Sequence, residues 1–276
     1  MTADAVHLII CFLLKIPTQM RKHVLVVPPF LVDGGFSSMR AANFDMREWL
    51  TRCGRFNNIP WAELIFRFKV VLWPIRVDEH FSLVVTYNIP ALAEWLSAKN
   101  EDPTILQDRA IRTVRAFHFD SGNSHDELRH VPFALARIYE MRFPQGANDW
   151  INLKDKFYEV VLRIKVDCYQ QQLEDCGMWT AYHAFLALRL VKFCPMQKCS
   201  YWGEYTPFQD AFNWLSDTQT YDEFKRSMQQ WATYFLTLAP GTRINVPKNG
   251  VVSVLNSEAN YISNDHLQEL EIETPG

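Results

Sequence analysis

Several features that define other protein classes are missing from this chain. It contains neither a Gly-x-Ser-x-Gly elbow nor a Gly-rich phosphate loop ending in Gly-Lys-Ser/Thr, which removes the commonest serine-hydrolase and nucleotide-binding sites. The apolar run at residues 8–14 is far shorter than the ~20 residues that a membrane-spanning helix needs. Asp4 stands where a secretory signal would be basic. We therefore expect no membrane partner and an intracellular protein of the nucleus or cytoplasm.

A large excess of charge of one sign is also absent. Lys and Arg total 28 against 31 for Asp and Glu, so the net charge of -3 gives no electrostatic reason to expect nucleic acid as the partner. The 6 cysteines are irregularly spaced, unlike the dense framework of a small secreted scaffold, and free thiols in a reducing compartment fit better.

Metal-binding patterns are equally scarce. Cys194 and Cys199 lack both a Cys-x-x-Cys spacing and a second matching pair. His125 and His130 are five positions apart, so they would not share a helix face as the two histidines of a zinc hydrolase do. We predict no metal site and no cofactor.

The chain does have ample material for a core, because 48% of its residues are hydrophobic and 14% are aromatic. We predict one domain over residues 1–245 and a polar, mobile tail over 246–276. Apolar periodicity and turn signals predict strands at residues 66–71, 80–87, 116–120 and 160–168. They predict helices at residues 3–15, 46–53, 91–98, 105–115, 126–142, 177–193, 208–215 and 221–238.

Cys176 lies between a predicted strand and the start of a long apolar helix. The free N–H groups and positive dipole at a helix start stabilise a thiolate, which lowers the pKa of a thiol and raises its reactive fraction. Gly177 follows and lets the backbone pack closely around the sulfur. By itself this position also suits an inert buried thiol.

Three motifs, in the same order, give residues 71–193 a resemblance to the catalytic core of the SUMO-specific (sentrin-specific) proteases, which process ubiquitin-like proteins. A strand with a proline and a histidine is matched by the segment from Trp73 and Pro74 to His80. The hydrophobic-Asp-Ser strand end is similar to residues 119–121, and the Gln-rich segment before Asp-Cys-Gly is similar to residues 170–177.

The resemblance implies a cysteine-type peptidase with a catalytic triad. Cys176 would be the nucleophile, His80 the general base and Asp120 the group that orients the imidazole. Gln170 would hold the oxyanion, with Gln171 as the alternative because consecutive glutamines leave the register open.

The same resemblance implies a papain-like α+β fold, in which helices flank a central mixed sheet. Trp73, Phe81 and Gly177 would contact the substrate. Phe81 departs from the tryptophan that usually covers the tunnel for the Gly-Gly tail, which leaves the identity of the modifier open. The stretch at residues 88–115 reads as a helical insertion that separates His80 from Asp120.

Three functions remain open. The first is cleavage after the C-terminal Gly-Gly of a SUMO-like or other ubiquitin-like modifier, with that modifier and its conjugates as partners. An acetyltransferase could use the same triad, and a catalytically weak adaptor could bind a ubiquitin-like protein in a degenerate groove.

Two further histidines, His118 and His183, could be considered as site residues. His183 is seven residues beyond Cys176, ~10 Å along the helix axis, too far for proton transfer to that thiol, and we expect it to be packed or at the surface. His118 alternates onto the same strand face as Asp120, where it is either a structural residue or a partner of the triad.

Overall fold

The computed structural model describes residues 5–6, 9–10, 24–27, 55–56, 59–60, 65–77, 79–97, 102–122, 131–142, 150–168, 175–190, 206–218 and 220–237. The predicted helix at 46–53 and the predicted tail at 246–276 lie outside these residues. Of the helix predicted at 3–15, residues 5–6 and 9–10 are described, and they are helical.

Within the described residues, five strands form a mixed sheet in the order β1-β4-β5-β6-β7. The strands are β1 (Val24–Val26), β4 (Val70–Val77), β5 (His80–Tyr87), β6 (Arg115–Phe119) and β7 (Leu162–Val166). β4, β5 and β6 run antiparallel, whereas β1 is parallel to β4 and β7 is parallel to β6. A separate two-stranded pair joins β2 (Arg55–Phe56) to β3 (Ile59–Pro60).

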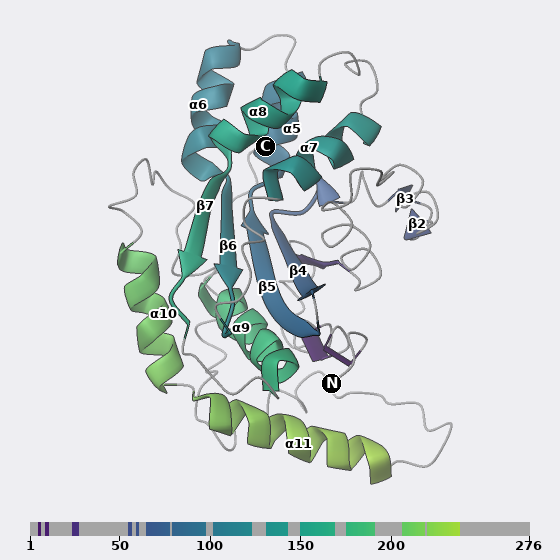
Figure 1. Cartoon of the computed structure of the whole chain (residues 1–276), viewed down its shortest axis with the longest axis vertical. Coiled ribbons are helices and arrows are strands. Elements are labelled where there is room, and N and C mark those ends of the chain that lie inside the picture. Colours follow the sequence, from purple (N-terminus) through teal and green to yellow (C-terminus); the bar gives the residue numbers. More distant parts are fainter. Residues whose placement is uncertain are drawn as a thin grey trace, which may run out of the picture.

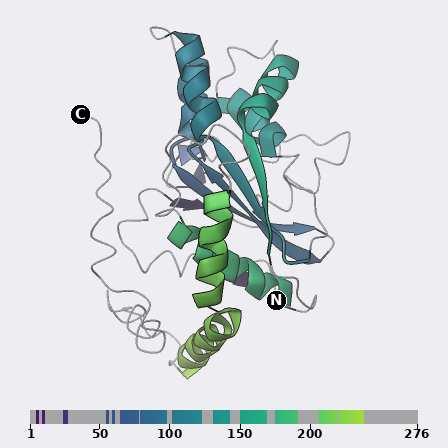
Figure 2. The ribbon, with the colours of Figure 1, turned by 90° about the vertical axis from the view of Figure 1, so that its left-hand side faces the viewer.

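The helices fall into two groups with the sheet between them (Figures 1 and 2). One group comprises α5 (Pro90–Ser97), α6 (Pro103–Thr113), α7 (Val131–Arg142) and α8 (Trp150–Val160). The other comprises α9 (Cys176–Leu190), α10 (Thr206–Thr218) and α11 (Tyr221–Thr237). The first group gathers at the top of Figure 1 and the second at the bottom.

Each group of helices encloses its own hydrophobic core. Along β4, the side chains of Val71 and Trp73 enter the core shared with α5 to α8, while those of Val70 and Leu72 enter the core shared with α9 and α11. This alternation follows from the two-residue period of a strand, which sends successive side chains to opposite faces. A sheet with both faces covered explains why β5 is buried along its whole length.

The strand predicted at residues 66–71 was misplaced. The observed β4 begins at Val70 and continues to Val77, through Pro74. A proline lacks the backbone N–H that an interior strand donates, so a strand through Pro74 is an unusual feature. Among the described residues, β1 pairs with β4 only as far as Leu72, so no described strand requires a backbone donor from Pro74 on that side.

Other elements follow the predictions with shifted ends or were missed. The stretch at 88–115 does contain two helices, although α6 ends at Thr113 and Arg115 already belongs to β6. β1 was missed because three apolar residues before a pair of prolines carry little periodic signal. α8 was also missed, since its charged residues obscure the apolar stripe that includes Phe157 and Val160.

The packing of α8 against α7 can be tested at Phe157. Its side chain is fully buried and meets the ring of Tyr139 edge to face at 5.9 Å. We predict that Phe157→Ala lowers the free energy of unfolding by about 3–5 kcal/mol, because it removes buried apolar surface and leaves a cavity. The neighbouring Tyr158 is 42% exposed, and Tyr158→Ala should cost less than about 1 kcal/mol. Urea denaturation measures the free energy of unfolding of both variants, and equal decreases in the two would contradict this packing.

Candidate active site

Strand pairing brings His80 and Asp120 together although they are 40 residues apart. β5 and β6 are antiparallel, and Leu83 lies opposite Phe119. The start of β5, at His80, therefore lies beside the end of β6, which Asp120 directly follows. The helices α5 and α6 occupy the interval between the two strands, so the predicted insertion leaves this pairing intact.

A tight turn positions the backbone just before His80. Val77 of β4 pairs with His80, so only two residues connect the strands. The second of them, Glu79, has a φ of 67°, in the left-handed region that residues with side chains rarely occupy. Two-residue hairpins require such angles. The carbonyl oxygen of Glu79 then lies 3.9 Å from the sulfur of Cys176, which donates to it.

Cys176 is the first residue of α9, at the helix end where backbone N–H groups have no partner within the helix. The predicted position between a strand and a helix start is thus observed. Thr180, one turn on, donates its hydroxyl to the Cys176 carbonyl at 2.9 Å. Both the thiol and the neighbouring Gly177 are buried.

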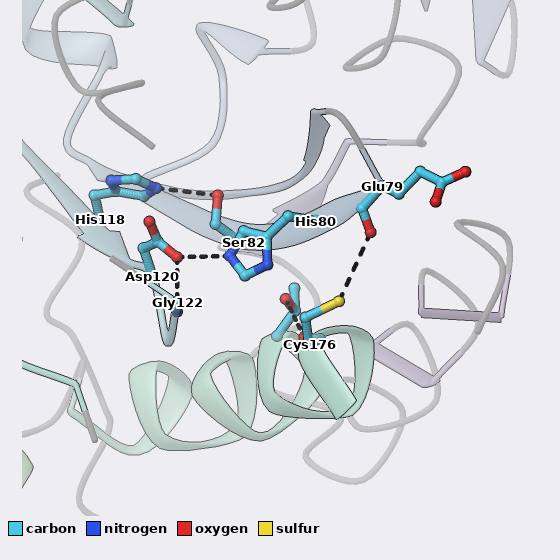
Figure 3. A network of polar contacts seen from close by, with 8 residues as sticks. Glu79, His80, Ser82, His118, Asp120, Gly122 and Cys176 are labelled. Atoms are coloured by element: carbon cyan, nitrogen blue, oxygen red, sulfur yellow. Dashed lines mark hydrogen bonds and ion pairs between the residues drawn. The ribbon is translucent and has the colours of Figure 1, made fainter. Parts of the chain in front are cut away.

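The three predicted catalytic side chains meet in space (Figure 3). The Nε2 atom of His80 lies 2.7 Å from Oδ1 of Asp120, whose side chain is fully buried. The imidazole ring is placed between that carboxylate and the side chain of Cys176. With Nε2 bound to Asp120, Nδ1 is the ring nitrogen that can exchange a proton with the thiol.

The electrostatics favour a charged pair. Hydrogen bonding to Asp120, followed by interaction with Cys176, raises the pKa of His80 to about 9. Burial pushes the pKa of the Cys176 thiol up, but His80 and the backbone N–H groups of Phe81 and Gly177 outweigh it and hold that pKa below its ordinary value. Both shifts favour transfer of the thiol proton to the imidazole, and a thiolate is the form of cysteine that acts as a nucleophile.

Helix α11 packs against the start of α9, the helix that begins at Cys176. Lys225 forms an ion pair with Asp175, the residue directly before Cys176. The ring of Tyr221 stacks on that of Trp179, with centroids 3.9 Å apart and planes at 6°. These contacts fix the first turn of α9 from outside the sheet. The sequence shows both helices, but it carries no signal that pairs them.

His118 and His183 are both buried near the triad. The Nε2 atom of His118 lies 3.0 Å from the hydroxyl oxygen of Ser82. The register of β5 and β6 places Ser82 beside Asp120. His118 thus lines the same strand face as Asp120, as predicted. His183 is buried against the rings of Phe119 and Trp179. Burial lowers its pKa to about 3, so it stays neutral.

The three residues predicted to contact substrate, Trp73, Phe81 and Gly177, are buried, and their role in substrate binding stays a prediction. Trp73 is only 3% exposed and its indole N–H donates to the hydroxyl of Thr86 at 2.9 Å, so it belongs to the core beneath α5 to α8. The ring of Phe81, 4% exposed, is likewise part of a core, and it is its backbone N–H that acts on the thiol. The backbone N–H of Gly177 likewise lowers the pKa of the Cys176 thiol.

Gln170 and Gln171 lie outside the described residues, so the oxyanion donor remains a prediction. One neighbour of the triad was missed. Gly122 donates its backbone N–H to Oδ1 of Asp120 at 3.0 Å, and the only sequence signal was a glycine after a strand end. Among the described residues, no cluster of three or more His, Cys, Asp or Glu side chains is suited to hold a metal.

Comparison with solved structures supports the fold. Neither a protein-family model nor a curated protein sequence matches the chain. A solved structure described as a de-sumoylating protease superposes with a TM-score of 0.50 at 12% identity, covering 92% of this chain and 87% of that one. A structure of the SUMO protease Ulp1, its catalytic cysteine oxidised to a sulfenic acid, covers 79% of this chain and 78% of its own at 14% identity, with a TM-score of 0.36.

The fold is therefore α+β, with a mixed sheet flanked by helices, and it is similar to that of a SUMO protease. The predicted fold class is confirmed. In the part of the chain that the structure describes, no helix combines the length and the apolar character needed to cross a bilayer.

The His80–Asp120 contact predicts a pH dependence of stability. The pKa of His80 is raised from 6.5 to about 9 in the folded chain. A raised pKa contributes stability in full below about pH 6.5, and this contribution is lost as the pH rises through the folded value. Asp120→Asn removes the largest cause, so the loss of stability between these pH values should shrink by on the order of 1 kcal/mol.

The measurement is urea denaturation across this pH range, with and without Asp120→Asn. Both proteins should carry Cys176→Ala, so that the thiol does not titrate alongside the imidazole. Identical slopes of unfolding free energy against pH in the two proteins would show that Asp120 does not control the protonation of His80.

Proposed function

We propose that this protein is a cysteine peptidase that cleaves after the C-terminal glycine of a SUMO-like modifier. The observation that carries the proposal is the alignment of Asp120, His80 and Cys176, with the imidazole held at 2.7 Å by a buried carboxylate and facing a thiol at a helix start. This arrangement supplies a nucleophile, a base and an orienting group, which are the parts that acyl transfer requires.

In the proposed reaction, the Cys176 thiolate attacks the carbonyl carbon of the terminal glycine. The protonated imidazole of His80 then gives its proton to the leaving amine, which is a lysine side chain in a conjugate or a backbone nitrogen in a precursor. A water molecule, deprotonated by His80, hydrolyses the thioester. The backbone N–H of Cys176, together with Gln170 or Gln171, is proposed to hold the oxyanion.

Two independent lines support a ubiquitin-like substrate over other acyl compounds. The motifs at His80, Asp120 and Cys176 resemble those of the SUMO-specific proteases in their order along the chain. The fold is similar to that of a de-sumoylating protease over most of both chains. The buried His80–Asp120 contact beside a thiol, with the pKa of His80 raised to about 9, also favours an enzyme over a non-catalytic adaptor, because perturbed pKa values cluster at catalytic sites.

The proposal predicts covalent capture by a SUMO modifier whose C-terminal glycine carries an electrophile such as a vinyl ester. The wild-type protein should form an adduct at Cys176, and Cys176→Ala should form none. Turnover of a SUMO precursor should fall by at least about 1000-fold in the same variant, because the nucleophile is removed. Mass spectrometry of the adduct identifies the modified residue.

Cys168 provides the matched control. It is a second free cysteine among the described residues. Its pKa is raised, mainly by burial, and this makes it a poor nucleophile. Cys168→Ser should still be captured. Capture at Cys168, or tight binding of the probe without any adduct, would overturn the proposal, and the latter result would favour an adaptor. Transfer of label from acetyl-CoA to a protein, with no cleavage of SUMO, would favour the acetyltransferase.

A further inference from the structure

We propose that Gly122 is a positioning residue of the triad, because its missing side chain and its backbone N–H together fix the His80 imidazole against Asp120. This inference deepens the proposed function and names a residue for which the sequence motifs assign no role. It rests on two separate contacts, one of which is a close approach and the other a hydrogen bond.

The close approach leaves no room for a side chain at position 122. A Cβ atom there would lie 2.7 Å from Cε1 and 3.0 Å from Nε2 of the His80 ring. Carbon atoms in contact prefer separations of about 3.5–4.0 Å, so alanine could not be accommodated without movement. The backbone of Gly122 does not occupy the left-handed region, which means that space for the imidazole, and not an unusual φ, is what requires glycine.

The hydrogen bond ties the same glycine to the carboxylate. Oδ1 of Asp120 accepts from the Gly122 N–H at 3.0 Å and also contacts Nε2 of His80 at 2.7 Å. Oδ1 of Asp120 therefore links the His80 imidazole to the backbone of Gly122, the residue that the ring packs against. Carboxylate oxygens have the lone pairs to accept both, and charge-assisted hydrogen bonds of this kind are the stronger ones.

The cheapest way to relieve a clash at position 122 is to move the imidazole. Asp120 and Ser121 are buried, and β6 before them is fixed by pairing with β5 and β7, so the backbone has little freedom. The ring of His80 is the end of a side chain and can turn aside. Turning would carry it out of line with Asp120 and Cys176, and a misplacement of about 1 Å can reduce the rate about 100-fold.

The test is the variant Gly122→Ala, compared with His80→Ala and with the double variant. The first readout is the rate at which iodoacetamide alkylates Cys176 as a function of pH, followed by mass spectrometry of the peptide that contains it. In wild type, we expect the reaction to persist at pH 6.5 because His80 stabilises the thiolate. Gly122→Ala should slow it about tenfold or more at that pH, toward the rate of His80→Ala.

The double variant supplies the decisive control. Once His80 is alanine there is no ring to displace, so adding Gly122→Ala should change neither the alkylation profile nor the thermal midpoint by a measurable amount. A wild-type alkylation profile in Gly122→Ala would overturn the inference. So would an effect of Gly122→Ala that persists in full without His80, or a double variant that fails to fold while His80→Ala folds, because either places the requirement in the backbone.

Failure of this inference and failure of the proposed function are distinguishable. Alkylation requires no modifier, so the coupling between positions 80 and 122 can be measured even if SUMO is not a substrate. If SUMO is cleaved, Gly122→Ala should lower kcat about 100-fold with KM unchanged, since the substitution displaces the imidazole and not the bound modifier. A change confined to KM would show that Gly122 contacts substrate and does not position His80.

Discussion

The register between β5 and β6 is the constraint on which the site depends. Because Leu83 lies opposite Phe119, His80 and Asp120 are diagonal neighbours where β5 begins and β6 ends. A slip of one residue would send every side chain of one strand to the other face and separate the imidazole from the carboxylate. Hydrophobic side chains on both faces of these strands resist such a slip, so the packing of the two cores and the alignment of the triad are secured by the same pairing.

The parts of the molecule that sequence could predict are those whose signals are local. The thiol at the start of a helix is visible from the polar residues before Cys176 and the apolar run after it. His80 and Asp120 were identified by short motifs at strand ends, and the structure brings both beside Cys176. The two helices between them were also predictable, since each carries its own periodicity. Because these two helices lie outside the sheet, β5 and β6 still pair directly, and His80 and Asp120 meet despite the 40 residues between them.

What sequence could not supply is information about which elements touch. The indole N–H of Trp73 donates to Thr86 on the neighbouring strand, and no local pattern indicates that contact. Nothing near Tyr221 in the sequence indicates that it stacks on Trp179. The extension of β4 through Pro74 depended on where β1 stops pairing, which is likewise a property of the assembled sheet. Features of this kind depend on tertiary contacts, which the periodicity of a sequence does not report.

The burial of Asp120 explains why so many contacts converge on it. A carboxylate removed from water loses several kcal/mol of solvation, and it stays charged only where donors replace the lost water. Here the Gly122 N–H and the imidazole of His80 both meet Oδ1. The carboxylate in turn is the main reason that the pKa of His80 rises to about 9. The proton that lets His80 stabilise a thiolate is thus held by the same interaction that makes a buried aspartate tolerable, so the catalytic alignment and the local stability of the fold cannot be altered independently.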